Sequence, residues 1–214
     1  MLAGASDPKV EFTVTLSITS DQNPEDATYD LPEDKELLIG SGEHCDIKCN
    51  DLLADRNHCF IRVVNGEIWF TDNYSSYGSF IKANTKELCS LPASAFCLGN
   101  TLFNITQKDK STFEVEKIGA SSRQTFTVVV PADIKVGRDV SDKISVPEDE
   151  TISVHHAQLK FDLTSRSWQI KDHGRTGNGS SNGTWIKLAV PTTIVTHEDI
   201  IRIGKESFLV FARK

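Results

Sequence analysis

Long apolar runs are missing from this 214-residue sequence, in which no stretch approaches the roughly 20 apolar residues that cross a bilayer. Residues 1–9 lack both a basic leader and an apolar core, so a secretion signal is not expected. Runs of Lys and Arg are also missing, which argues against a general nucleic-acid binder. We therefore expect no membrane partner and no nucleic-acid partner.

Cysteine is missing from the second half of the chain, and the first half holds an odd number without regular spacing. Such a set does not form a disulfide framework. A reducing intracellular location, in the nucleus or the cytoplasm, fits this usage better. The five residues are Cys45, Cys49, Cys59, Cys89 and Cys97.

Catalytic motifs are missing as well. The sequence contains no Gly-x-Ser-x-Gly elbow, no Walker loop and no His-Glu-x-x-His motif. Adjacent residues of a strand point to opposite faces, so His155 and His156 do not form a catalytic dyad. The same geometry separates His44 from Cys45 and His58 from Cys59, which with Cys49 are the candidate zinc ligands. We expect no enzyme activity, no metal and no cofactor.

The charge is distributed unevenly along the chain. Residues 1–119 hold 10 Lys+Arg against 19 Asp+Glu, whereas residues 120–214 hold 13 against 11. An anionic ligand should therefore prefer the second half.

Short runs of β-forming residues fill the chain, and little of it has the helical period of 3.6. Residues 10–18 and 124–130 alternate apolar and polar side chains, and each run opens a new series of strands. Strands this short and closely spaced favour a sandwich or barrel. The further predicted strands are 37–39, 59–64, 68–70, 101–105, 134–136, 157–161, 168–170, 184–186, 200–203 and 208–211.

A repeat of about 100 residues relates the two halves, because four short motifs recur in the same order. This predicts two all-β domains of one fold, residues 1–117 and 124–214, joined by a Gly- and Ser-containing linker at residues 118–123. The matched pairs are Leu38-Ile39-Gly40-Ser41 with Lys135-Val136-Gly137-Arg138, Asp55-Arg56-Asn57-His58 with Ser153-Val154-His155-His156, Ser75-Ser76-Tyr77-Gly78-Ser79 with Ser180-Ser181-Asn182-Gly183-Thr184, and Leu98-Gly99 with Ile203-Gly204.

In the second half, the polar groups of the repeated motifs, Arg138, Ser153, Ser181 and Asn182, fall at strand ends or in loops. There a sandwich presents binding groups on a rigid frame. They supply a guanidinium, hydroxyls and an amide, and none of these is a good general base. Such a set suits a phosphate dianion, because Arg can bind it with two charge-assisted hydrogen bonds.

The order Gly-Arg, Ser-x-x-His, Ser-x-Asn-Gly-Thr and Asp-x-Ile-x-Ile-Gly resembles the signature of forkhead-associated (FHA) domains. Almost the whole second half carries it, as Gly137-Arg138, Ser153 to His156, Ser180 to Thr184 and Asp199 to Gly204. The resemblance implies an FHA-type β-sandwich that binds phosphothreonine in a threonine-phosphorylated protein or peptide through loops at one end.

By this resemblance, Arg138 and Ser153 bind the phosphate and Ser181 assists, while Asn182 holds the peptide backbone. Gly183 and His156 shape the loops, and Gly137 and Thr184 belong to the same structural motif. Val154 stands where the family often has Arg or Asn, which alters the contacts after the phosphothreonine. We also predict that Arg175 adds a second cation near the peptide and that the acidic loop 148–150 favours basic residues nearby.

The first half follows the same outline without the phosphate chemistry. Ser41 replaces the Arg, Asp55 the Ser and Tyr77 the Asn, and the framework residues Gly40, His58 and Gly78 remain. An Asp facing a phosphate repels it. We therefore expect this degenerate copy to serve docking or dimerisation, including a homodimer, with a basic partner suited to its charge.

The sequence thus predicts a phosphorylation-dependent adaptor or scaffold. Two alternatives stay open: a structural pair of domains that binds partners independently of phosphorylation, and the regulatory segment of a larger signalling enzyme. Binding to a phosphothreonine peptide but not to its dephosphorylated twin separates the first prediction from the structural pair.

Overall fold

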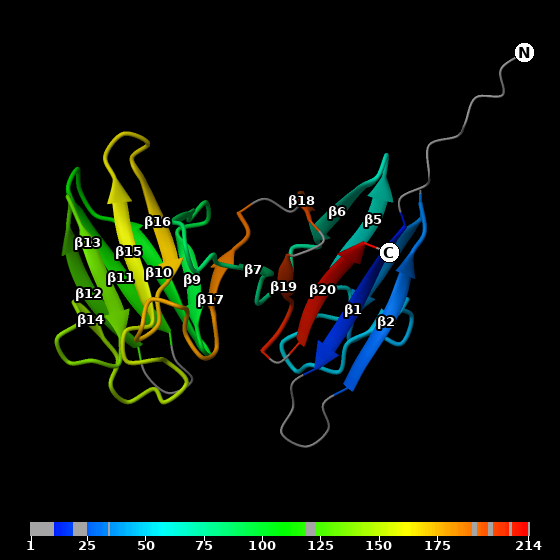
Figure 1. Ribbon diagram of the computed structural model, residues 1–214, viewed down its shortest axis with the longest axis horizontal. Coiled ribbons are helices and arrows are strands. Elements are labelled where there is room, and N and C mark those ends of the chain that lie inside the picture. The colour runs from blue at the N-terminus through cyan, green and yellow to red at the C-terminus, as the bar shows by residue number, and fades with distance from the viewer. Residues whose placement is uncertain are drawn as a thin grey trace, which may run out of the picture. The chain divides into compact units, whose positions relative to one another are not determined.

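The computed structural model describes residues 11–18, 25–33, 35–118, 123–189, 192–196, 199–205 and 207–213. All the named elements within these ranges are β-strands, so the predicted all-β class is confirmed. Within the same ranges, no helix has the length and apolarity needed to cross a membrane. Figure 1 shows the strands in chain order.

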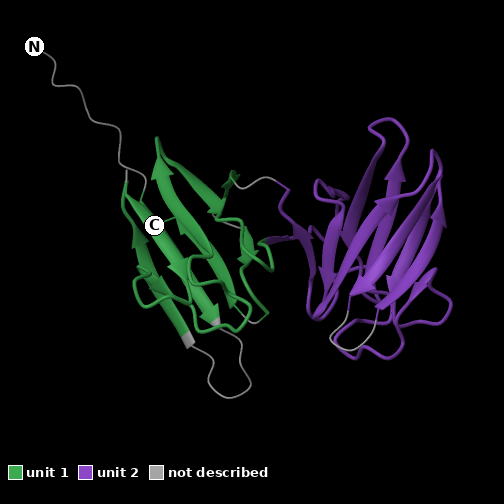
Figure 2. Cartoon of the chain, turned by 180° about the vertical axis from the view of Figure 1, so that it is seen from behind, with its two compact units in different colours: residues 1–79, 190–214 green, residues 80–189 purple. Residues whose placement is uncertain are grey.

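The chain divides into two compact units, of which one is a continuous segment and the other is built from two separate segments (Figure 2). Unit 1 combines Met1–Ser79 with Val190–Lys214, and unit 2 is the continuous segment Phe80–Ala189. Unit 2 is therefore inserted between two segments of unit 1, and each unit contains strands from both halves of the repeat.

Unit 1 contains two mostly antiparallel layers, with strand orders β19-β20-β1-β2 and β18-β6-β5-β3-β4. The alternating pattern of β1 buries Phe12, Val14 and Leu16 in the core. β1 pairs over its whole length with β20, so strands far apart in the sequence are neighbours in one sheet. The strands are β1 (Phe12–Ile18), β2 (Glu25–Leu31), β3 (Glu36–Gly40), β4 (Ile47–Lys48), β5 (Cys59–Val64), β6 (Glu67–Asp72), β18 (Thr192–Val195), β19 (Ile200–Arg202) and β20 (Ser207–Arg213).

Unit 2 repeats this plan, with strand orders β12-β11-β10-β9-β17-β7 and β14-β13-β15-β16-β8. Its core includes Phe113, Phe161 and Trp168, whose rings meet at centroid distances of 5.2 to 5.3 Å. Green strands of the first half share the unit with yellow strands of the second half in Figure 1. The strands are β7 (Phe80–Lys82), β8 (Cys89–Ser90), β9 (Ala95–Leu98), β10 (Thr101–Gln107), β11 (Thr112–Ile118), β12 (Arg123–Val129), β13 (Asp133–Gly137), β14 (Ile144–Ser145), β15 (Ala157–Asp162), β16 (Ser167–Asp172) and β17 (Thr184–Lys187).

The limits of the compact units differ from the predicted domain limits, 1–117 and 124–214. β11 pairs with β12 from Thr112↔Val129 to Ile118↔Arg123, so the predicted linker 118–123 joins two paired strands of unit 2. Residues 119–122 of that linker lie outside the described residues. The β10–β11 pair, whose strands follow one another along the chain in unit 2, corresponds to the β20–β1 pair in unit 1. Unit 2 is thus a circularly permuted version of the same sandwich.

Candidate functional site

The predicted site residues of unit 2 lie in three loops that meet at one edge. Arg138 follows β13, Ser153 precedes β15, and Ser181 and Asn182 lie between β16 and β17. The backbone N–H of Arg138 donates to the carbonyl of Ser153 (3.1 Å), which ties the first loop to the second. The backbone N–H of Ser181 donates to Ser153 Oγ (3.2 Å), which ties in the third. The structure therefore brings these residues together around Ser153.

Two side chains hold the segment just before Ser153. Arg138 Nε donates to the carbonyl of Ile152 (2.6 Å), and Asn182 Nδ2 donates to the carbonyl of Thr151 (2.8 Å). The first of these bonds occupies one of the three guanidinium nitrogens of Arg138. Among the described residues, no carboxylate forms a salt bridge with this guanidinium. The two terminal nitrogens of this guanidinium therefore form no ion pair within the described residues.

His156 lies inside this edge and is hydrogen-bonded through both ring nitrogens. The N–H of Ser153 donates to Nδ1 of His156 (2.9 Å), so the ring proton resides on Nε2 and is donated to the carbonyl of Gly183 (3.0 Å). Its side chain is fully buried, and burial lowers the pKa of His156 although Gly183 and Asp172 act to raise it. A neutral imidazole therefore joins the Ser153 loop to the Gly183 turn.

The histidine framework predicts a loss of stability as the solution is acidified. Burial lowers the pKa of both His58 and His156 in the folded protein, whereas the unfolded chain titrates near 6.5. The unfolded state therefore takes up protons first, and stability present above about pH 6.5 is lost as the pH falls toward the folded pKa. Each histidine can contribute a slope of at most about 1.4 kcal/mol per pH unit.

Denaturant unfolding between about pH 7.5 and pH 5 measures this slope. Carboxylates whose pKa is lowered in the folded state, such as Asp139, lose their stabilisation only near and below about pH 4 and leave that window to the histidines. The exposed variant His44→Gln should keep the slope of the natural protein. A stability that does not change over this range would contradict the buried neutral assignment.

Gly137, Gly183 and Thr184 lie at sterically constrained or buried positions of this edge. A Cβ on Gly137 would lie 2.3 Å from the carbonyl oxygen of Val154, so no side chain fits there. Gly183 has φ of +71°, a conformation that favours glycine. Thr184 is fully buried, and its hydroxyl donates to Asp172 Oδ1 (3.0 Å). The same carboxylate accepts the N–H of Ser180 (3.2 Å).

Two predicted contact residues are not joined to this network. Val154 is half-buried, and it contributes its backbone carbonyl, which accepts the N–H of Asp139 (2.9 Å). Arg175 is exposed between β16 and β17, and no hydrogen bond or salt bridge links it to another described residue. Their roles in peptide contact stay predictions.

The acidic loop 148–150 has internal partners that its spacing did not reveal. Glu148 forms a salt bridge with Lys117, and Asp149 accepts a hydrogen bond from the Thr101 hydroxyl. Burial acts to raise the pKa of Asp149, but the hydrogen bonds from Thr101 and Thr151 lower it on balance. Glu150 is the exposed member of the three that has no such contact among the described residues. The sequence reasoning missed Thr101 and Lys117, because their partners Asp149 and Glu148 lie 48 and 31 residues away in the sequence.

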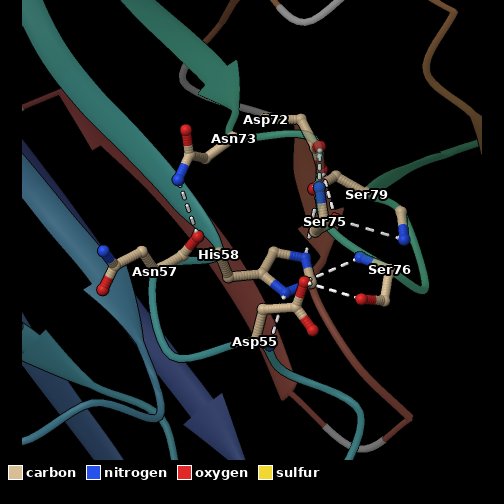
Figure 3. Close-up of polar contacts among 9 residues, drawn as sticks. Asp55, Asn57, His58, Asp72, Asn73, Ser75, Ser76 and Ser79 are labelled. Carbon is tan, nitrogen blue, oxygen red and sulfur yellow. Dashed lines mark hydrogen bonds and ion pairs between the residues drawn. The ribbon is translucent and has the colours of Figure 1, made fainter.

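Unit 1 has the same loop framework with different chemistry at its centre (Figure 3). The N–H of Asp55 donates to His58 Nδ1 (3.1 Å), as the N–H of Ser153 does to His156. Ser41 Oγ donates to the carbonyl of Ala54 (2.9 Å), in the place of the Arg138 side chain. The repeat therefore conserves the geometry of the edge without its cation.

The carboxylate of Asp55 takes the hydrogen-bond donors of the neighbouring loop. Its Oδ2 accepts both the N–H (2.7 Å) and the hydroxyl (3.0 Å) of Ser76. In unit 2 the equivalent N–H, that of Ser181, meets the neutral Ser153 hydroxyl. An anion inside unit 1 thus already uses the donors that a bound phosphate would need.

The candidate zinc ligands of unit 1 have other partners. His44 Nε2 lies 2.5 Å from Asn57 Oδ1, and Cys45 Sγ donates to the carbonyl of Arg56 (3.0 Å). Cys49 and Cys59 are buried, and burial raises the pKa of both thiols. In the part of the chain that the structure describes, no group of three or more His, Cys, Asp or Glu residues could hold a metal.

Loops on one edge of a β-sandwich, two of them joined by the buried His156, thus hold the predicted site residues. The family model for the FHA domain matches residues 37–93 and 134–204, more than half of the chain. The chain therefore belongs to the FHA domain family, whose domains are interaction modules rather than enzymes.

Several solved FHA structures are similar to the chain at low sequence identity. The FHA domain of the CT664 protein from Chlamydia trachomatis is 10% identical with a TM-score of 0.40, covering 94% of this chain and 96% of that one. An FHA domain from a study of phosphothreonine-dependent FHA interactions is 12% identical with a TM-score of 0.37, covering 94% and 95%. FHA-1 of Rv1747 from Mycobacterium tuberculosis is 14% identical with a TM-score of 0.27, covering 56% and 97%. Among curated proteins, none matches the chain.

Proposed function

We propose that the protein is a phosphorylation-dependent adaptor or scaffold that binds a phosphothreonine peptide at the loop edge of unit 2. One observation carries the proposal: Arg138, Ser181 and Asn182 all contact residues 151–153, while no described carboxylate pairs with the Arg138 guanidinium. A cation fixed by its own backbone contact, without a counter-ion, is suited to an incoming dianion.

The contacts divide the work of recognition among three side chains. The bond from Arg138 Nε to Ile152 orients the guanidinium, and its terminal nitrogens supply two charge-assisted donors to the phosphate. The Ser153 hydroxyl donates a hydrogen bond to the same phosphate, and Ser181 lies beside Ser153. Asn182 is fixed through Nδ2 to Thr151, so its amide oxygen is oriented to accept a backbone N–H of the peptide.

Unit 1 serves docking or dimerisation in this proposal. It contains 18 Asp+Glu and 9 Lys+Arg, a net charge of −9, whereas unit 2 has 12 and 14. Leu52 and Tyr74 are exposed in its loops, at 101% and 86% of their reference areas. Acidic and apolar exposed groups together suit a basic, amphipathic partner, which can bind independently of phosphorylation. The five free cysteines support a reducing location, the nucleus or the cytoplasm.

A paired titration tests the proposal on the full chain. A degenerate phosphothreonine peptide library should bind, and the dephosphorylated library should not bind at the same concentrations. A phosphoserine library is the third arm, because it keeps the phosphate charge and removes the threonine methyl group. Equal binding of the phosphorylated and dephosphorylated libraries would reject the reader assignment and favour the structural pair of domains.

A further inference from the structure

The loop that carries Ser153 is supported by residues from the first half of the sequence. It runs from β14 to β15, and the turn between β9 and β10 lies against it. The N–H of Asn100 donates to Thr151 Oγ1 (3.2 Å). A Cβ on Gly99 would lie 2.3 Å from the same oxygen, so the turn packs directly against the loop and leaves no room for a side chain at residue 99.

A chain of hydrogen bonds leads from this turn to the site. The hydroxyl of Thr101 donates to Asp149 Oδ2, and Asp149 Oδ1 accepts the N–H (3.0 Å) and the hydroxyl (2.6 Å) of Thr151. The carbonyl of Thr151 then accepts Asn182 Nδ2 (2.8 Å). Thr101 is therefore three hydrogen bonds away from the side chain of Asn182, without itself lying among the site residues.

A second support comes from β11. The side chain of Lys117 is 3% exposed, and its ammonium pairs with Glu148, which precedes Asp149 in the same loop. A buried ammonium is costly without its partner. This pair therefore restrains the loop through Glu148. Both supports come from strands that precede the repeat boundary expected from the sequence.

The same arrangement recurs in unit 1, where the supporting turn comes from the other end of the chain. Asp51 precedes Asp55 by four residues, as Asp149 precedes Ser153, and its Oδ1 accepts the N–H of Leu53 (2.9 Å). A Cβ on Gly204, between β19 and β20, would lie 2.4 Å from the Asp51 carboxyl carbon. Two independent copies thus use an aspartate to join the site loop to a glycine turn.

We propose that Thr101 and Lys117 are positioning residues for the phosphopeptide site, so that the reader is complete only within residues 80–189. This inference rests on the proposed function of unit 2. Thr101 acts through Asp149 and Thr151 on Asn182, and Lys117 acts through Glu148. The site in the second half of the sequence therefore depends on side chains in the first half.

Substitution of Thr101 in the full chain tests the inference. Thr101→Val keeps the shape of the side chain and removes its hydroxyl, and it should weaken phosphothreonine-peptide binding about fivefold or more. Thr101→Ser restores a hydroxyl and should restore the affinity. The matched control is Thr127→Val on β12, where an exposed threonine loses its hydroxyl outside the loop. Unchanged affinity in Thr101→Val, or no recovery in Thr101→Ser, would overturn the inference.

Amide hydrogen exchange at residues 151–153 separates this inference from the proposed function. Exchange there should accelerate in Thr101→Val and in Asp149→Asn, and not in Thr127→Val, whether or not any peptide binds. If the natural chain binds no phosphopeptide while this exchange pattern holds, the proposed function fails and the positioning of the loop stands. If the exchange is the same in all variants, the positioning role is rejected. Asp149→Asn provides a second route should Thr101→Val fail to fold.

Discussion

Arg138→Ala should reduce the affinity for a phosphothreonine peptide at least about tenfold, because a charge-assisted hydrogen bond contributes roughly 1.5 to 3 kcal/mol. The guanidinium contacts the Ser153 loop through the carbonyl of Ile152, and no described carboxylate pairs with it. Its removal therefore leaves the dianion with neutral donors. Isothermal titration with a phosphothreonine peptide and with its dephosphorylated twin measures the effect.

Arg166→Ala is the matched control, because Arg166 is exposed in the turn between β15 and β16. It removes one positive charge from the same unit without touching the loop edge, and it should bind like the natural protein. Arg175→Ala then tests the predicted second cation separately. If Arg138→Ala and Arg166→Ala weaken binding equally, general attraction to unit 2 explains the affinity, and the specific assignment of Arg138 is rejected.

Ser153→Asp should abolish binding, with a loss of more than about a hundredfold. The substitution copies Asp55 of unit 1, whose carboxylate accepts both donors of Ser76. In unit 2 the new carboxylate would capture the N–H of Ser181 and face the phosphate. Two unit charges about 4 Å apart repel by roughly 4 kcal/mol at an effective dielectric constant near 20, and the phosphate carries close to two charges.

Ser153→Ala separates the lost hydroxyl from the added charge. It should weaken binding by about tenfold, the lower end of the range for a hydrogen bond to a charged group. Both variants are measured with the same peptide, and thermal unfolding reports whether unit 2 remains folded. Comparable affinities for Ser153→Asp and Ser153→Ala would mean that the phosphate does not lie beside residue 153.

Much of the fold was readable from local sequence patterns. The alternating run that predicted a strand at 10–18 forms β1, and the run at 124–130 forms β12. β2 was missed because it is an edge strand that pairs with β1, so its residues need no apolar alternation. Two-residue strands such as β4 and β14 are too short to have a period.

The assignment of strands to units could not be predicted in the same way. Two halves of equal fold offer each strand two equivalent partners, and local patterns do not distinguish them. β12 follows β11 along the chain and pairs with it, although the predicted domain boundary at residues 118–123 separates the two strands. The partner of a strand depends on tertiary packing, which short motifs do not encode.

The candidate site was predictable where short motifs carry the chemistry. Arg138, Ser153 and Asn182 carry functional groups suited to phosphate, and the repeat order placed them in loops. The contacts of Thr101 and Lys117 were not predictable, because neither residue belongs to a motif and each reaches its partner across the sandwich. Arg175 is exposed, and its predicted contact with the peptide stays a prediction.

The insertion of one unit within the other sets the order in which they can form during synthesis. All strands of residues 80–189 are synthesised before β18, β19 and β20. Domains generally fold as soon as their strands are available. The inner module can therefore form from one continuous segment, whereas the outer one needs β18, β19 and β20, which are synthesised after the inner module.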